Sequence, residues 1–305
     1  MSASRKVAGT DLRAWLQLVR LPNLLSVPGD PWAGLALASL ANGQGPAPSA
    51  FILSGLASLC LYAAGLILND LHDEAADRVH RPERPLPSGR VPRLAAARLG
   101  TALGTLGVVL ALPLGRAAFL TVLLLAALVA AYNLQFKGHR LNASVCMGLC
   151  RGFSLLLGAA AGGFGFAPLA AAAGLTVYIG AVTWMAAGEN HTQTFERIPL
   201  VPARAFAVAG ALAALALIRS APIASWLVGV ALVAWTIHRL WLHGRRLVGK
   251  PIPPATMQPA VGGYIRQLIP WQAGLLAMAA CPLLAVGLLV LAPLARKLAR
   301  HYAES

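Results

Sequence analysis

The chain has 305 residues, of which 58% are hydrophobic and only 11% are charged, and its formal net charge is +15. This balance is typical of a polytopic membrane protein and argues against a soluble fold. The basic residues lie between apolar runs without aromatic residues among them, so we expect no nucleic-acid partner. Because no polar linker divides the apolar runs, we expect one all-α membrane domain over residues 1–305.

About 20 apolar residues are needed for one membrane span, and the sequence offers about nine such runs. Residues 1–23 are polar and basic, which predicts a cytoplasmic N-terminal segment without a cleaved signal peptide. Residues 294–305 form a basic tail. The predicted spans are Leu24–Ala41, Phe51–Leu68, Leu94–Leu114, Ala117–Leu134, Val145–Gly163, Leu169–Ala187, Ala203–Ile218, Ile223–Leu242 and Trp271–Pro293.

The basic residues predict the orientation of these spans. With a cytoplasmic N-terminus, 20 of the 25 lysines and arginines fall on the cytoplasmic side. The polar side chains are concentrated in the same cytoplasmic loops, so we expect a site that opens to the cytoplasm. We expect the membrane to be a bacterial inner membrane. A channel or ion pump would need ionisable residues spread through the helices, and a transporter is the least favoured of the alternatives. Only the basic tail disagrees with nine spans.

A concentration of acidic residues follows the second apolar run. Five of the ten acidic residues in the chain lie between Asn69 and Arg90. On a helix, Asn69, Asp73 and Asp77 are four residues apart and stack on one face, with Asp70 beside them. Three oxygen-bearing side chains on one face suit a hard divalent cation such as Mg²⁺. The spacing therefore predicts a metal site, with a merely solvated loop as the alternative.

Prolines and arginines follow the acidic positions. Pro82, Pro85 and Pro87 stiffen the segment, and Gly89 allows a tight turn. Guanidinium groups match phosphate oxygens, so we expect a rigid cover that binds a polyanionic ligand next to the metal. The arginines that we assign to this ligand are Arg78, Arg81 and Arg84.

These residues resemble a known motif. Asn69-Asp70-x-x-Asp73-x-x-x-Asp77, followed by Arg81-Pro82-x-Arg84-Pro85-Leu86-Pro87-Ser88-Gly89, is similar to the first aspartate motif of the UbiA superfamily of intramembrane prenyltransferases. The segment Trp15–Asn23, the stretch Tyr132–Arg140 and the number of helices are also similar. The resemblance implies a helical bundle around a central cavity, in which Mg²⁺ assists transfer of a prenyl group from its diphosphate.

The resemblance also implies substrate-binding residues outside the acidic stretch. It places Lys137 and Arg140 near the diphosphate and Tyr132 near the reactive carbon of the prenyl group, and it adds Asn23 and Asn142 to the substrate site. From the residues alone, Tyr132 and Lys137 are equally an interfacial aromatic ring and a snorkelling lysine.

One arginine lies inside an apolar run. Arg151 interrupts the stretch Ala143–Leu157. An arginine within the membrane is costly and normally faces an internal polar partner. We therefore expect Arg151 to face inward and to serve the substrate site.

A second acidic stretch, Glu189–Arg197, follows the sixth run. The resemblance implies acids at its first, fourth and eighth positions, which here are Glu189, Thr192 and Glu196. We expect both glutamates to act as metal ligands and Gln193 to add a neutral oxygen. Fewer formal charges should hold Mg²⁺ less tightly. The alternative is that the glutamates pair with nearby arginines.

The expected activity is Mg²⁺-dependent transfer of a prenyl group from a prenyl diphosphate to an aromatic or other lipophilic acceptor among the membrane lipids. Asn69, Asp70, Asp73, Asp77, Glu189 and Glu196 are the expected catalytic residues. Two alternatives stay open because the second motif is altered. One is terpene cyclisation without an acceptor. The other is a catalytically weakened lipid-binding or assembly protein, similar to the EboC-like branch of the superfamily.

Overall fold

The protein is almost entirely helical, which confirms the predicted class. A computed structural model describes residues 11–188 and 191–302. The helices are α1 (Leu12–Leu18), α2 (Leu21–Leu24), α3 (Gly29–Ala41), α4 (Pro48–His80), α5 (Arg93–Leu110), α6 (Arg116–Ala131), α7 (Arg140–Ala161), α8 (Phe166–Ala186), α9 (Val201–Leu217), α10 (Ile223–Arg245), α11 (Pro254–Ile265), α12 (Leu268–Met278) and α13 (Pro282–Tyr302). Short turns η1 (Leu112–Leu114), η2 (Tyr132–Phe136) and η3 (Ile198–Leu200) adjoin α5, α6 and α9. Among the described residues, seven helical segments are long and apolar enough to cross a membrane. They are α4, α5 with η1, α6 with η2, α7, α8, η3 with α9, and α10.

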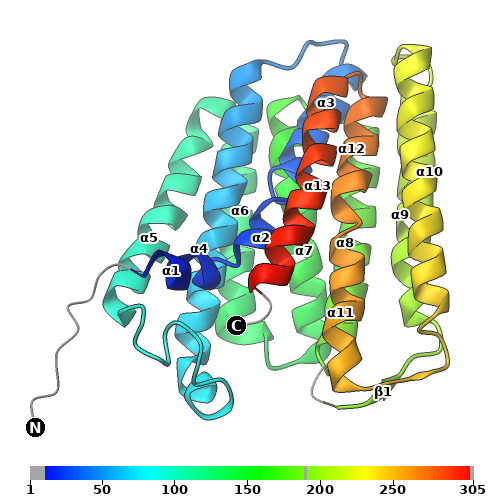
Figure 1. Ribbon diagram of the computed structural model, residues 1–305. Coiled ribbons are helices and arrows are strands. Elements are labelled where there is room, and N and C mark those ends of the chain that lie inside the picture. Colours follow the sequence, from blue (N-terminus) through cyan, green and yellow to red (C-terminus); the bar gives the residue numbers. More distant parts are fainter. Residues whose placement is uncertain (1–10, 189–190, 303–305) are drawn as a thin grey trace, which may run out of the picture.

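The long helices form one bundle in which consecutive helices run in opposite directions (Figure 1). Helix α7 packs against α3, α6 and α8 and is the most buried of the seven spans. Helix α5 packs mainly on α4 and is the least buried span. The core of the bundle is therefore built around α7, and α5 is peripheral.

Close approach of α7 to its neighbours depends on glycine. A Cβ atom at Gly158 would lie 1.8 Å from the carbonyl oxygen of Pro31 in α3. One at Gly148 would lie 2.3 Å from the carbonyl oxygen of Thr176 in α8. Small residues allow membrane helices to approach backbone to backbone, and here they bring α3, α7 and α8 together around the interior.

The first predicted span is shorter than its apolar run. Helix α3 begins at Gly29, five residues after the predicted start. Pro28 lacks an N–H group and disfavours helical backbone at the residue before it, so the chain is irregular between α2 and α3. Arg20, which precedes α2, has a left-handed backbone with φ of 47°.

The last predicted span, Trp271–Pro293, is wrong as one helix. Helix α12 ends at Met278, Ala280 has a positive φ of 60°, and α13 starts at Pro282. Proline at position 282 disfavours helical backbone at Cys281, which explains the turn. Helix α13 then runs back along α12 (Figure 1). This additional reversal removes the disagreement between the basic tail and an odd number of spans.

A small antiparallel sheet ties two loops together at one end of the bundle. Strand β1 (Gln193–Thr194) pairs with β2 (Pro251–Ile252), with Gln193 opposite Ile252. The backbone N–H of Gly249 also donates to the carbonyl of Phe195 at 2.9 Å. In Figure 1 this sheet lies at the same end of the bundle as the loop that follows α4.

The reversal at Ala280 makes a topological prediction. In a variant without native cysteines, Lys250→Cys and a cysteine appended to the C-terminus should react with a membrane-impermeant maleimide from the same side of sealed vesicles. Ser220→Cys, an exposed position at the opposite end of α9, should react from the other side. Labelling of the appended cysteine together with Ser220→Cys would contradict the turn between α12 and α13.

Candidate functional site

The C-terminal part of α4 presents two oxygen-bearing side chains to one cation. The ammonium group of Lys137 donates to Asn69 Oδ1 at 2.7 Å and forms an ion pair with the Asp73 carboxylate. Asn69 and Asp73 are one helical turn apart, as the spacing predicts. Asp77, the third predicted position, turns instead to Arg84 at 2.7 Å. Of the three predicted positions, Asn69 and Asp73 thus contact the Lys137 ammonium group, and Asp77 contacts Arg84 instead.

Lys137 reaches α4 because the chain after α6 forms a turn of π-helix, η2. The N–H of Lys137 donates to the carbonyl of Tyr132 across this wider turn, at 3.1 Å. The following Asn133 is buried, and its amide donates to the carbonyls of Val129 and Gly65 at 2.9 and 3.4 Å. A π-turn holds one more residue than an α-turn and is frequent at functional sites. Here it accompanies the placement of Tyr132 and Lys137 beside α4.

A second layer of ion pairs fixes the proline-rich cover to α4. Asp70 and Asp77 are both buried, and the guanidinium of Arg84 lies 2.7 Å from Asp77 and 4.0 Å from Asp70. Arg20 approaches Asp70 from the α1–α2 segment at 3.3 Å. The side chain of Leu86, which belongs to the cover, is buried in an apolar cluster with Leu18 and Ile67. The cover is therefore held both by charge and by apolar packing.

Glu74 organises a third group of charges on another face of α4. Its carboxylate pairs with Arg78, one turn further along, at 2.7 Å, and with Arg93 at the start of α5. Arg78 is thus engaged away from Lys137. The backbone N–H of Arg81 closes α4 by donating to the carbonyl of Asp77 at 2.8 Å. Sequence reasoning missed the roles of Glu74, Arg93 and Arg20, whose partners come from different elements.

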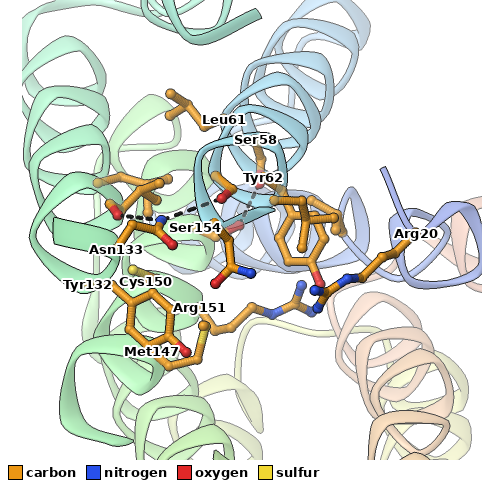
Figure 2. A pocket seen from close by; sticks show the side chains of 16 residues that line it. Arg20, Ser58, Leu61, Tyr62, Tyr132, Asn133, Met147, Cys150, Arg151 and Ser154 are labelled. Carbon is orange, nitrogen blue, oxygen red and sulfur yellow. Dashed lines mark hydrogen bonds between the residues drawn. The ribbon is translucent and has the colours of Figure 1, made fainter. Parts of the chain in front are cut away.

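A cavity with a free volume of about 150 Å³ lies inside the bundle next to Asn69. It is formed by α4, α6, η2, α7 and the α1–α2 segment, and most of its wall is apolar. Its polar lining residues are Arg20, Ser58, Tyr62, Asn69, Tyr132, Asn133, Arg151 and Ser154. In the view of Figure 2, Arg20 and Arg151 reach toward Tyr62 from opposite sides. Three predicted site residues, Asn69, Tyr132 and Arg151, therefore share one cavity.

The internal partner of Arg151 is Asp30, at 2.9 Å. Asp30 is fully buried in α3, and Arg151 is only 6% exposed. The amide of Gln272 in α12 donates to Asp30 at 2.5 Å and to the carbonyl of Ser26 at 2.8 Å. This buried network joins α3, α7 and α12 behind the cavity. No pattern near Arg151 in the sequence indicates Asp30 or Gln272.

Arg140 holds the second acidic stretch. Its guanidinium donates to the carbonyl of Trp184 at 2.7 and 2.9 Å and to Gln193 Oε1 at 2.8 Å, and it lies 4.7 Å from the centre of the Trp184 ring. The amide of Gln193 donates in turn to the carbonyl of Met185 at 3.3 Å. The oxygen that was expected to add a metal ligand is therefore engaged by Arg140. Both side chains fasten the loop after α8 to α7.

Several predicted site residues lie apart from the cavity. Asn23 belongs to α2 and does not line it, and Asn142 is exposed in the first turn of α7. Glu196 is exposed in the loop after β1, and no hydrogen bond or ion pair joins it to another described residue. Glu189 lies outside the described residues.

The arrangement at Asn69 and Asp73 fits a divalent cation. In residues 11–188 and 191–302, no three His, Cys, Asp or Glu side chains form a group that could hold a metal by themselves. Mg²⁺ commonly keeps several waters and uses one or two carboxylates together with substrate phosphates. Asn69 Oδ1 and the Asp73 carboxylate already converge on the Lys137 ammonium, so they suit such a shared site.

The Asp30–Arg151 pair generates a stability prediction. Arg151→Met would leave a buried carboxylate uncompensated and should destabilise the protein by about 3–5 kcal/mol. Asp30→Asn combined with Arg151→Met removes both charges and should recover most of that loss. Arg116→Met, at an exposed helix start, is the control. Unfolding in detergent micelles measures all four proteins, and a double variant as unstable as Arg151→Met would contradict the pairing.

Known proteins similar to this chain bear on its identity. The model of the UbiA prenyltransferase family matches residues 31–197. The chain is 34% identical over 154 residues to digeranylgeranylglyceryl phosphate synthase of Ignicoccus hospitalis, covering 50% of this chain and 49% of that protein. It is 28% identical over 152 residues to the synthase of Sulfolobus acidocaldarius, covering 50% and 54%. The chain thus spans about half the length of the curated relatives it matches.

Solved structures show the same fold. A UbiA homolog from Archaeoglobus fulgidus bound to GPP and Mg²⁺ has a TM-score of 0.57 at 18% identity, covering 87% of this chain and 99% of that one. The apo UbiA homolog from Aeropyrum pernix has a TM-score of 0.57 at 16% identity, covering 88% and 97%. These structures show the fold alone. The family match over residues 31–197, more than half of the chain, shows that the protein belongs to the UbiA prenyltransferase family.

Proposed function

We propose that this protein transfers a prenyl group from a prenyl diphosphate to a lipid acceptor inside the membrane. The observation that carries the proposal is the convergence of Asn69 and Asp73 on one cation, Lys137, at the edge of a mostly apolar cavity. A polar cation site joined to an apolar cavity suits a ligand with an anionic head and a hydrocarbon chain.

The residues around the cavity would have different roles in the reaction. Asn69 and Asp73 would hold Mg²⁺, which when bound stabilises negative charge on the leaving diphosphate. Lys137 and Arg20 would stabilise the same negative charge on the oxygens of the leaving diphosphate. The ring of Tyr132 lines the cavity and would face the allylic carbon, while the apolar wall keeps water from the reacting group. Arg140 would act indirectly, by holding the second acidic stretch in place.

The acceptor is proposed from the relatives. Those reported above are named digeranylgeranylglyceryl phosphate synthases, which favours a glyceryl phosphate lipid over an aromatic acceptor. Mostly basic loops at the end of the bundle that holds Asn69 and Asp73 favour a cytoplasmic site, since basic loops remain in the cytoplasm.

The test is turnover of a labelled prenyl diphosphate by the purified protein in lipid nanodiscs with Mg²⁺, with and without a prenylated glyceryl phosphate. We expect an acceptor-dependent lipid product. Asp73→Ala should lower its rate by about 100-fold or more, because the carboxylate that would hold the metal beside the diphosphate is lost. Glu83→Ala, which removes an exposed carboxylate from the cover, should leave the rate unchanged.

Other outcomes would replace the proposal. A hydrocarbon product that forms without an acceptor indicates a cyclase. Binding of the diphosphate without turnover indicates a lipid-binding or assembly role. Equal rates for Asp73→Ala and Glu83→Ala would refute the assignment of the α4 face.

A further inference from the structure

The chain after residue 190 carries positive charge that its own carboxylates do not balance. Residues 191–302 contain eleven lysines and arginines but one acidic residue, Glu196. Six of these cations are exposed on α9, on α10 and in the two loops that β1 and β2 join. We call them the basic surface, and they are Arg197, Arg204, Arg239, Arg245, Arg246 and Lys250.

The basic surface differs from the cationic side chains around α4. There, each of five cations forms an ion pair with a carboxylate. In the described part of the chain, no ion pair or side-chain hydrogen bond joins a member of the basic surface to another residue. The exposed Glu196 offsets at most one of the six charges. The remaining positive charge therefore attracts anions from outside the protein.

Backbone contacts hold two parts of the basic surface together. Strands β1 and β2 pair, and Phe195 forms a further bridge with Val248. A Cβ atom at Gly244 would lie 2.3 Å from the carbonyl oxygen of Pro199, so the end of α10 packs directly on the backbone of η3. These contacts place the loop that carries Arg197 against the end of α10 and the loop that follows it. Like charges held close together repel one another, and a bound anion relieves that repulsion.

The outward face of α10 places part of the basic surface at the edge of the membrane. Trp235, Arg239, Leu242 and Arg246 follow one another at intervals of four, three and four residues, so they lie on one face of the helix. All four are exposed, and the Arg239 guanidinium lies 5.9 Å from the centre of the Trp235 ring. Tryptophan rings gather where the hydrocarbon meets the lipid head groups. This face of α10 therefore leads from the lipid tails to the head groups.

We propose that the basic surface binds the phosphate groups of anionic glycerophospholipids in the surrounding membrane. The head group would accept hydrogen bonds from the guanidinium groups, while the acyl chains lie along the apolar outward side of α10. A soluble acidic protein is a poorer fit, because it reaches the loops but not Arg239, which lies among lipid-facing side chains. No member of the basic surface lines the cavity next to Asn69, so the inference does not depend on prenyl transfer.

Selective retention of lipid tests the proposal. The purified protein is mixed in detergent with equal amounts of phosphatidylglycerol and phosphatidylcholine of the same acyl chains, and native mass spectrometry measures which lipid stays bound. We expect phosphatidylglycerol to be retained about tenfold or more over phosphatidylcholine, since each cation near a membrane surface favours an anionic lipid. Arg245→Gln combined with Arg246→Gln should lower this preference by about threefold or more.

The matched control removes two exposed arginines from the opposite end of the bundle. Arg116→Gln combined with Arg219→Gln changes the net charge by the same amount and should keep the wild-type preference. Equal retention of the two lipids by the wild-type protein would overturn the proposal. An equal loss of preference in the two double variants would overturn it as well, because the charge would then act without a defined site.

A measurement on the unaltered protein locates the lipid. In nanodiscs, a phosphatidylglycerol with a diazirine in its head group should crosslink to residues 235–250. Unlabelled phosphatidylglycerol should suppress this crosslink more strongly than phosphatidylcholine. Crosslinks confined to α4 and the η2 turn would place the anionic head group at Asn69 and Asp73 instead, and equal suppression by both lipids would indicate contact with bulk lipid. Either result would refute the proposal.

Discussion

The acidic end of α4 is the constraint on which the site depends. Asp70, Asp73, Glu74 and Asp77 crowd within two helical turns of a helix that also spans the membrane, and carboxylates so placed need positive partners. Each partner comes from a different part of the chain. They are Arg20 before α2, Arg78 on α4, Arg84 in the cover, Arg93 at the start of α5 and Lys137 after η2. The ion pairs that neutralise the end of α4 therefore bring four neighbouring segments together: the segment before α2, the cover, the start of α5 and the chain after η2.

Because the carboxylates of α4 are paired with cations from other segments, the sequence predicted the arrangement of these side chains only in part. The four-residue spacing of Asn69 and Asp73 is local, and so is the turn chemistry of the cover. The spacing predicted that Asn69 and Asp73 share one face of α4, and both side chains contact Lys137. Asp77 points to Arg84 because a loop arginine seven positions away reaches it, and helical spacing alone does not reveal that competition. Position on a helix face predicts where a side chain starts but not which partner it binds.

Long-range partners escaped prediction altogether. Gln272 bonds to Asp30 across 242 positions, and no local pattern links a glutamine in α12 with an aspartate in α3. Arg151 was correctly expected to face inward, because an apolar run makes an isolated charge conspicuous. The turn between α12 and α13 was overlooked although Pro282 marks it. Apolar composition continues through Ala279–Cys281, so hydropathy predicted one helix. The backbone forms two helices, α12 and α13, with a turn at these residues.

The two acidic stretches differ in how they are held, and this bears on the chemistry. In the described part of the chain, five cationic side chains pair with the four carboxylates of α4. A bound diphosphate alone would more than offset that excess of positive charge, whereas a diphosphate together with a divalent cation would leave the site close to neutral. The second stretch offers no comparable cluster among its described residues. There Arg140 and Gln193 satisfy each other, and Glu196 is exposed. Charge balance therefore supports the proposal that diphosphate and metal bind on the α4 side. The second stretch is fixed chiefly by Arg140 and the β1–β2 pairing.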